Sequence, residues 1–468
     1  MIRARLSQCR NWVAGGTMTA DVAFEGVATD SRTAPPGSLF IALRGENFDA
    51  HAFLTDVAAR GVAAIVADAS CAPQHLANLT VPLLLVPDTR RALGEIALGW
   101  RRQFAVPMIG VTGSNGKTTV KEMIAAILVA GVGAAHAMAT RGNFNNDIGL
   151  PLTLLRLDAG IHAAVVEIGM NHPGEIAQLA ALAQPTVALV NNAQREHQEF
   201  MATVEAVAQE NGAVFASLPD DGAAVFPADD AYTPLWRALA LARGSRRLLG
   251  FGLSADADVR CTYVANTFGS DMAVTAGVDT FTVRLAAAGE HNVRNALAAI
   301  ACTRAIGMPV EAIVRGLEAF APVAGRLQRK QRANGAQVID DTYNANPDSV
   351  RAAIDVLAQA SAPRVLVLGD MGEVGDDGAT FHEEIGAHAR ARGIDHLLTF
   401  GVLALASTQA FGRQATHFND IDALQAAAVA LATPPATVLV KGSRFMQMER
   451  VVNHLIGPLP GQPIQDSH

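Results

Sequence analysis

The stretch Val111-Thr112-Gly113-Ser114-Asn115-Gly116-Lys117-Thr118-Thr119 (VTGSNGKTT) follows an apolar run, VPMI (106–109), and precedes VKEMIAAILVA (120–130), which has helical spacing. Glycines at 113 and 116 let the backbone curl so that its N–H groups point at an anion. The positive end of the following helix adds to that attraction. This order of strand, glycine turn and helix predicts a parallel α/β sheet with a phosphate-binding loop at its edge.

The Gly-Lys-Thr ending of the loop indicates which groups would hold a nucleotide. Lys117 would reach the β- and γ-phosphates, and Thr118 would place its hydroxyl on Mg²⁺. The strict pattern G-x-x-x-x-G-K-[ST] has a glycine where this sequence has Val111, so the loop is a variant. An ordinary strand-to-helix turn is the alternative, but such a turn does not require Gly-Lys-Thr. We therefore expect residues 113–119 to bind the phosphates of ATP.

Composition favours a folded protein with several domains. The chain has 468 residues, which suggests about three domains. Half of the residues are hydrophobic and 17% are charged, which excludes a disordered chain. The formal net charge of −8 argues against a protein that wraps nucleic acid, although a local pocket can still be positive.

The same survey indicates a cytoplasmic protein. No apolar run approaches the ~20 residues of a membrane helix, and the N-terminal segment lacks the apolar core of a signal peptide. The four cysteines at positions 9, 71, 261 and 302 form no CxxC pair, which is typical of reduced thiols in the cytosol. We expect no membrane insertion and no nucleic-acid partner.

Alternation of strand and helix divides the chain into three parts, 1–100, 101–321 and 322–468. In the first part, strands in GVAAIVAD and VPLLLVPD follow a helix expected over 50–61. The second part repeats strand and helix, as in a parallel sheet covered by helices, and changes to an antiparallel pattern within 247–285. The third part is again βαβα, resembles a dinucleotide-fold unit, and ends in a loose tail.

Two candidates follow strands of the second part. Glu167 ends the strand AAVVE, and His197 follows the strand TVALVNN. Ligands of open parallel sheets collect at the carboxyl ends of strands, so both side chains would lie near the phosphate loop. There they could hold a second divalent ion, directly or through water. A strand-end carboxylate and a surface-loop histidine without such a role remain the alternatives.

Eight motifs, in order along nearly the whole chain, resemble the Mur ligase family. They are GSNGKTTVKEM, RGNFNNDIGLPLTLL, EIGMNHPGEI, EHNVRNALAA, GRLQ, IDDTYNANPDSV, LGDMGEVG and VLVKGSRFMQMERVV. The resemblance implies an α/β protein of three domains: a small uridine-nucleotide domain, a central P-loop ATPase domain with a parallel sheet, and a C-terminal Rossmann-like domain. The TYNANPDS block differs from the DYAHNP-like block usual in the member that adds the third residue of the stem peptide.

This resemblance implies an ATP-dependent amide ligase of peptidoglycan precursor synthesis. ATP would phosphorylate the carboxylate of UDP-N-acetylmuramoyl-tripeptide, and the amine of D-alanyl-D-alanine would then displace phosphate. Lys117 and Mg²⁺ would supply the charge that brings two anions together. Positioning dominates such phosphoryl transfers, so no nucleophilic cysteine or serine is expected. We expect the enzyme to act as a monomer.

The resemblance also assigns roles by position. The catalytic set is Lys117, Glu167 and His197, and the Mg²⁺ ligands are Thr118, Glu167 and His197. Beyond the loop, the ATP-binding set adds His291, Asn292, Asn295, Arg326, Asp341, Tyr343, Asn344 and Asn346. The substrate-binding set is Ser31, Arg32, Arg44, Asp49, His51, Asn143, Asn145, Asn146, Lys441 and Arg444. Solvated surface arginines, a plain asparagine turn and helix caps are the alternative interpretations.

One position departs from the family pattern. Many Mur ligases carry a lysine, modified to a carbamate, that helps to hold the second Mg²⁺. The corresponding run here is VAQENGAVF (207–215), which places Asn211 there, or Gln209 in a shifted register. Neither side chain can form a carbamate, and Glu210 could supply a carboxylate instead. We therefore hypothesise an enzyme that does not depend on carbonate.

Two alternatives remain open. One is another amide ligase of the superfamily, either the ligase for the third stem residue or a folate polyglutamate synthetase, although the uridine-type first domain argues against the folate enzyme. The other is a P-loop switch that hydrolyses ATP without ligating anything. Lysine and diaminopimelate are both compatible with the third stem position.

Overall fold

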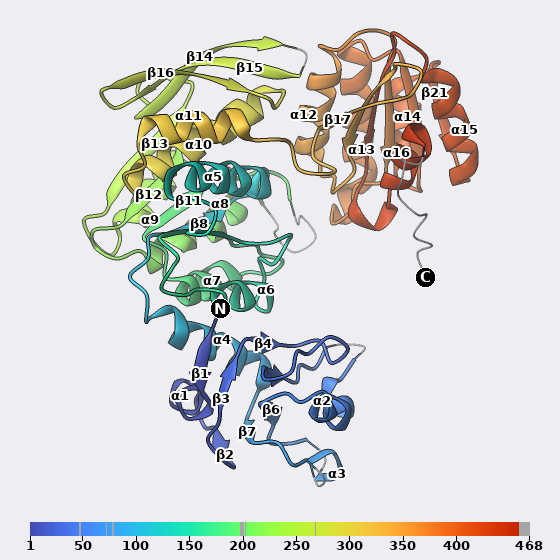
Figure 1. Ribbon diagram of the computed structural model, residues 1–468. Coiled ribbons are helices and arrows are strands. Elements are labelled where there is room, and N and C mark those ends of the chain that lie inside the picture. Colours follow the sequence, from blue (N-terminus) through green and yellow to red (C-terminus); the bar gives the residue numbers. More distant parts are fainter. Residues whose placement is uncertain are drawn as a thin grey trace.

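The chain forms three α/β units, each with its own sheet (Figure 1). The computed structural model describes residues 1–45, 48–71, 73–76, 79–196, 201, 203–266 and 268–457. The N-terminus lies where the first unit (blue) meets the central unit (teal to yellow), and the third unit (orange to red) lies beside the central one (Figure 1).

The first unit is built on a five-stranded sheet in which only the pairing of β2 with β7 is antiparallel. In spatial order its strands are β2 (Thr17–Met18), β7 (Leu83–Val86), β6 (Ala64–Asp68), β5 (Leu39–Ile41) and β4 (Val27–Ala28). A separate antiparallel pair is formed by β1 (Arg3–Arg5) and β3 (Ala23–Glu25). The helices are α1 (Leu6–Trp12), η1 (Ala50–Phe53), α2 (Leu54–Ala59), α3 (Pro73–Leu76) and α4 (Thr89–Arg101). The helix expected over 50–61 is therefore a 3₁₀ turn continued by α2.

The central unit has a nine-stranded sheet that is parallel from β9 to β14 and antiparallel from β14 to β16. In spatial order its strands are β16 (Asp279–Leu285), β15 (Gly269–Ala276), β14 (Val259–Asn266), β13 (Arg247–Gly252), β12 (Ala223–Pro227), β11 (Val187–Val190), β8 (Met108–Thr112), β10 (Ala163–Glu167) and β9 (Ala137–Ala139). The helices are α5 (Lys117–Val132), α6 (Gly149–Leu154), α7 (Glu175–Ala183), α8 (Val204–Gly212), η2 (Ala213–Ser217), α9 (Thr233–Leu241), α10 (Glu290–Ala305) and α11 (Val310–Ala319). The antiparallel pattern expected within 247–285 is confirmed for β14 to β16, whereas β13 is parallel.

The third unit has a six-stranded sheet that is parallel except for its edge strand β17. In spatial order its strands are β17 (Gln328–Gln331), β18 (Gln337–Asp341), β22 (Thr437–Lys441), β19 (Arg364–Gly369), β20 (His396–Phe400) and β21 (Ala415–Phe418). The helices are α12 (Pro347–Leu357), η3 (Gly375–Asp377), α13 (Gly378–Ala391), α14 (Ala404–Phe411), α15 (Ile421–Leu431), η4 (Arg444–Met446) and α16 (Glu449–Ile456). The expected βαβα order is confirmed.

The first and central units have separate sheets but share one cluster of buried apolar side chains. One cluster of buried side chains runs from the first unit into the central one, joining Ile2 and Leu39 to Met108 and Leu154. The third unit has two clusters of its own. Because successive side chains of a strand point to opposite faces, the two clusters cover the two faces of the third sheet.

The order of the central strands fixes where a ligand can bind. Strand β8 lies between β11 and β10, and all three run parallel. Their carboxyl ends therefore meet at one edge, which carries the phosphate loop, Glu167 and the segment 191–196. Among the described residues no helix is long and apolar enough to cross a membrane. The four cysteines are buried.

Candidate active site

A cavity of about 700 Å³ lies at this edge, between the central and third units. Most of the predicted site residues line it. They are Ser114, Asn115, Gly116, Lys117, Thr118, Thr119, Asn143, Asn145, Asn146, Glu167, His291, Asn292, Asn295, Arg326, Asp341, Tyr343, Asn344, Asn346 and Lys441. His197 lies outside the described residues.

The phosphate loop requires its two glycines for conformation and for space. Gly113 and Gly116 have φ values of 126° and 83°, in the left-handed region that favours glycine. A Cβ on Gly116 would lie 2.5 Å from Oδ1 of Asn295, and one on Gly113 would lie 2.9 Å from the backbone nitrogen of Asn191. The chain is therefore packed directly behind the loop, which leaves no room there for a side chain at either position.

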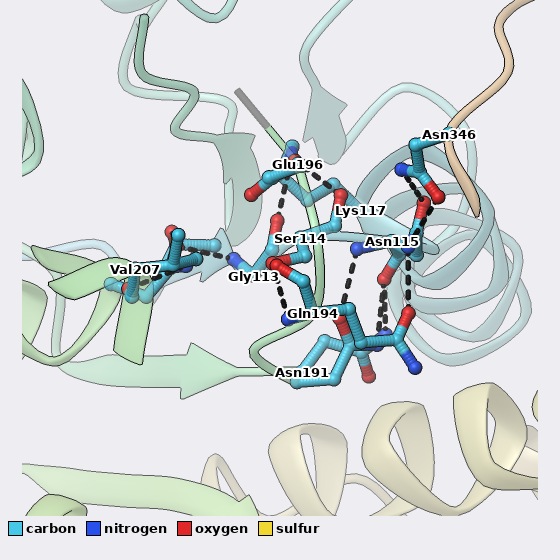
Figure 2. A network of polar contacts seen from close by, with 12 residues as sticks. Gly113, Ser114, Asn115, Lys117, Asn191, Gln194, Glu196, Val207 and Asn346 are labelled. Carbon is cyan, nitrogen blue, oxygen red and sulfur yellow. Dashed lines mark hydrogen bonds and ion pairs between the residues drawn. The ribbon is translucent and has the colours of Figure 1, made fainter. Parts of the chain in front are cut away.

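Lys117 bends back over the loop that precedes it (Figure 2). Its Nζ donates to the carbonyl oxygens of Gly113 at 2.6 Å and Ser114 at 3.0 Å. The same Nζ lies 3.3 Å from Oε2 of Glu196, a carboxylate that is 7% exposed. The ammonium group is thus held at the mouth of the loop, where the phosphates of a nucleotide would add to its anionic partners.

Thr118 and Glu167 meet at the carboxyl end of β10. The Thr118 hydroxyl donates to the Glu167 carboxylate at 3.0 Å, and Nη2 of Arg326 donates to the same hydroxyl oxygen at 3.0 Å. Asn145 donates from Nδ2 to Oε1 of Glu167 at 2.9 Å. Arg326 comes from the third unit, where its guanidinium also lies 4.1 Å from the centre of the Tyr343 ring. Side chains of both units therefore converge on one threonine oxygen.

The oxygen atoms of Thr118 and Glu167 are of the types that bind Mg²⁺. Mg²⁺ prefers carboxylate and hydroxyl oxygens and commonly takes only one or two ligands from the protein. The Thr118 hydroxyl and the 2% exposed Glu167 carboxylate are oxygen donors of these two kinds. Within the described ranges no group of three His, Cys, Asp or Glu side chains is gathered for a metal. The two oxygen donors are the part of the predicted metal set that the structure brings together.

A group of amides ties the loop to its surroundings and was missed by the sequence analysis. Asn191 donates from Nδ2 to the carbonyl oxygen of Asn115 at 2.8 Å and to Oδ1 of Asn295 at 2.9 Å. Oδ1 of Asn192 accepts the backbone N–H of Asn115 at 2.8 Å, and Gln194 accepts from the Asn115 side chain at 2.6 Å. Their position directly after β11, in NNAQRE, was the available signal.

Asn295 and Asn292 extend this amide group along α10. Nδ2 of Asn295 donates to Oδ1 of Asn292 at 3.1 Å, so the two side chains lie on one face of the helix. The cap of α10 is Gly289 rather than an asparagine. Desolvation lowers the pKa of the neighbouring His291 below its ordinary value, so that its imidazole is neutral at pH 7.

Asn211 supports the loop from behind, as a residue of α8. Its Oδ1 accepts the Gly113 N–H at 2.9 Å and also accepts from the Thr112 hydroxyl, while Nδ2 donates to the Val207 carbonyl at 3.1 Å. Glu210, considered above as a substitute carboxylate, instead accepts the backbone N–H of Ile176 at 3.0 Å in the first turn of α7. Asn211 is therefore a buried support of the loop, and Glu210 is engaged elsewhere.

The candidates in the first unit do not line the cavity. Arg32 pairs with Asp30 at 2.8 Å, and the Arg32 side chain is 85% exposed. The Asp49 carboxylate lies between two partners: its Oδ2 is 3.0 Å from Nε of Arg44, and its Oδ1 is 2.6 Å from Nδ1 of His51. Although burial raises the pKa of Asp49, hydrogen bonds from these partners hold it at about 2. Ser31 is buried.

Of three further basic residues, Lys441 and Arg90 line the cavity and Arg444 does not. Nζ of Lys441 lies 2.6 Å from Oδ2 of Asp341 and donates to the Asn344 carbonyl at 2.9 Å, which holds the strand ends of β18 and β22 together. Arg444 pairs with Glu449 at 2.9 Å and lies outside the lining. Arg90, at the start of α4, pairs with Asp147 at the cavity and was also missed.

Comparison with known proteins accounts for all three units. Family models match residues 23–101 (Mur ligase family, catalytic domain), 111–303 (Mur ligase middle domain) and 325–444 (Mur ligase, glutamate ligase domain). The chain belongs to the Mur ligase family. The three-domain α/β fold of a Mur ligase is thereby confirmed.

Relatives within the Mur ligases cover almost the entire chain. The UDP-N-acetylmuramoyl-tripeptide–D-alanyl-D-alanine ligase of Escherichia coli (strain K12) is 39% identical over 459 residues, which are 97% of this chain and 99% of the relative. The crystal structure of MurF from Acinetobacter baumannii is 33% identical with a TM-score of 0.90, covering 97% and 99%. MurF ligase from Thermotoga maritima in complex with ADP is 26% identical with a TM-score of 0.81, covering 92% and 97%.

Proposed function

We propose that this chain joins D-alanyl-D-alanine to UDP-N-acetylmuramoyl-tripeptide at the expense of ATP, giving UDP-N-acetylmuramoyl-pentapeptide, ADP and phosphate. The convergence of Glu167 from the central unit and Arg326 from the third unit on the Thr118 hydroxyl supports this proposal, because it places a phosphate site between two domains that could each hold one reactant. The names of the relatives, which span the whole chain, support the choice of substrates. We propose a cytoplasmic monomer.

Each unit would have one task. Residues 1–100 would bind the uridine nucleotide through Ser31, Arg32, Arg44, Asp49 and His51. Residues 101–321 would bind ATP and place the tripeptide carboxylate near Asn143, Asn145 and Asn146. Residues 322–468 would close the ATP site and bind the dipeptide, with Lys441 and Arg444 as candidate cations.

The chemistry needs charge and position rather than a covalent enzyme intermediate. A carboxylate oxygen of the tripeptide bonds to the γ-phosphorus of ATP as ADP leaves. The dipeptide amine then bonds to the acyl carbon, loses a proton, and phosphate departs with that oxygen. Lys117 and the N–H groups in the first turn of α5 would stabilise the phosphate charge, and Arg326 would approach it from the third unit. Mg²⁺ held by Thr118, Glu167 and the predicted ligand His197 would neutralise further charge.

A phosphate-release assay tests the proposal. Release should require the UDP-linked tripeptide and D-alanyl-D-alanine together, and oxygen-18 placed in the tripeptide carboxylate should appear in the phosphate. ATP turnover with neither substrate would support the P-loop switch, and a requirement for a single amino acid would support the sister ligase. Running lysine- and diaminopimelate-containing nucleotides side by side identifies the third stem residue.

A further inference from the structure

Arg195 joins the central unit to the third unit. It follows β11, and its Nη2 donates to Oδ1 of Asp348 at 2.6 Å while its Nη1 donates to Oε2 of Glu384 at 2.7 Å. Its backbone N–H also donates to Oδ2 of Asp348 at 2.9 Å. The guanidinium lies 5.4 Å from the centre of the Phe381 ring. One residue thus contacts α12 and α13 of the other unit at several points.

Partial burial and forked hydrogen bonds strengthen the ion pairs of Arg195. The side chains of Arg195 and Asp348 are each 23% exposed, and that of Glu384 is 35% exposed. Forked hydrogen bonds between arginine and carboxylate fix orientation as well as distance. The hydrogen bond from Arg195 is the main cause that lowers the pKa of Glu384. Exposed ion pairs contribute little, but partly buried pairs at interfaces contribute more.

This contact lies beside the phosphate loop. Asp348 is the second residue of α12, and Asn346 caps that helix by accepting the Ser349 N–H at 2.8 Å. Asn346 also donates from Nδ2 to Oδ1 of Asn115 at 2.9 Å, a contact that Figure 2 shows directly above the loop. The first turn of α12 is therefore held at two points, by Arg195 and by Asn115.

We propose that Arg195 is a positioning residue: it holds the first turn of α12 so that Asn346 stays on the phosphate loop and the third unit keeps its register on the ATP site. Its effect on turnover rests on the proposed function, whereas its effect on the arrangement of the units does not. Arg195 itself need not touch the reacting atoms.

The variants Arg195→Gln and Arg195→Lys test this against a matched control. Arg351→Gln is the control because Nη1 of Arg351 donates to the same Glu384 at 2.8 Å, yet both residues belong to the third unit. We expect Arg195→Gln to lower kcat about tenfold, as for loss of an interfacial charge pair. Arg195→Lys should retain part of the kcat that Arg195→Gln loses, and Arg351→Gln should have the kcat of the wild type.

A second comparison separates positioning from loss of folding. Small-angle scattering should give a larger radius of gyration for Arg195→Gln than for Arg351→Gln. The two variants should have the same thermal midpoint, which shows that both are folded. Asp348→Asn should reproduce most of the effect of Arg195→Gln, because it weakens the contact with the first turn of α12. The double variant should be no worse than Arg195→Gln, because that substitution already removes the contact. Equal scattering and equal kcat for Arg195→Gln and Arg351→Gln would overturn the inference. A wild type without substrate-dependent phosphate release would overturn the proposed function, and the scattering comparison would still decide the inference.

Discussion

Asn211 Oδ1 accepts the backbone N–H of Gly113 at 2.9 Å, so an amide on α8 fixes the first turn of the phosphate loop. Asn211→Leu would leave that buried N–H unsatisfied, at a cost of about 1–3 kcal/mol. We expect a lower thermal midpoint and a higher KM for ATP. Gln209→Leu, on the exposed side of the same helix, should change neither. An unchanged KM for ATP in Asn211→Leu would show that the loop keeps its shape alone.

The same amide leads to a prediction about carbonate. Asn211 uses its oxygen and its nitrogen in hydrogen bonds within the protein and cannot form a carbamate. Turnover should therefore be the same in bicarbonate-free buffer and after bicarbonate is added back. Loss of activity that bicarbonate restores would contradict this, and mass spectrometry of lysine-containing peptides would then locate the modified residue.

Gly116→Ala should impair ATP binding more than it impairs folding. An alanine there would adopt a φ of 83°, which costs about 1–2 kcal/mol, and its Cβ would collide with Asn295 2.5 Å away. Gly307→Ala is the matched control, with a φ of 81° and nothing within 4 Å. Calorimetric titration with ATP should show weakened binding for Gly116→Ala alone. Similar ATP affinity in both variants would mean that the loop shifts to accommodate the methyl group without losing its binding conformation.

Glu196→Gln should lower the KM for ATP. The Glu196 carboxylate lies 3.3 Å from Nζ of Lys117, where its negative charge opposes the approach of a polyphosphate. Replacing the exposed Glu205 by Gln removes the same charge farther along the chain and serves as the control. Steady-state kinetics at several ATP concentrations would measure the effect. A raised KM in Glu196→Gln would instead mean that this carboxylate helps to hold Lys117 in its binding position.

His382 predicts a loss of stability in acid. Its ring is fully buried, with Nε2 accepting the Met371 N–H at 3.0 Å and Nδ1 donating to the Gly378 carbonyl at 2.6 Å. Burial lowers its pKa from 6.5, so below about pH 6.5 the unfolded chain binds a proton that the folded chain does not. Stability therefore falls as the pH decreases through that value.

Thermal unfolding between about pH 5 and pH 8 checks this dependence, since protonation of the unfolded state is the linked event. His382→Gln should give a flatter midpoint curve than the wild type, whereas His454→Gln, at an exposed position, should leave the curve unchanged. Parallel curves for wild type and His382→Gln would place the acid sensitivity elsewhere.

Local signals in the sequence were sufficient where a short segment determines its own structure. Helix caps were one alternative for the predicted asparagines, and Asn346, directly before Pro347, indeed caps α12. The loop glycines predicted a turn that the positive φ values confirm. The strand and helix order predicted that Glu167 would lie near Thr118, because parallel strand ends share one edge.

Local sequence signals could not predict contacts between segments that are far apart along the chain. Arg195 and Asp348 are 153 positions apart, and no local pattern indicates that they meet. Arg32 could not be separated from a solvated arginine, and in the structure it pairs with its near neighbour Asp30. The parallel pairing of β13 was missed because its apolar pattern alone does not distinguish strand direction.

The shared apolar cluster under the first and central sheets has a consequence for how the protein could be divided. A fragment beginning at residue 322 would carry both hydrophobic faces of its sheet with their covering helices, as an autonomous folding unit does. A fragment ending at residue 100 would instead expose to water the apolar side chains that now pack against Met108 and Leu154. The third unit could therefore be exchanged between related proteins as a block, whereas the first unit and the central unit have to change together.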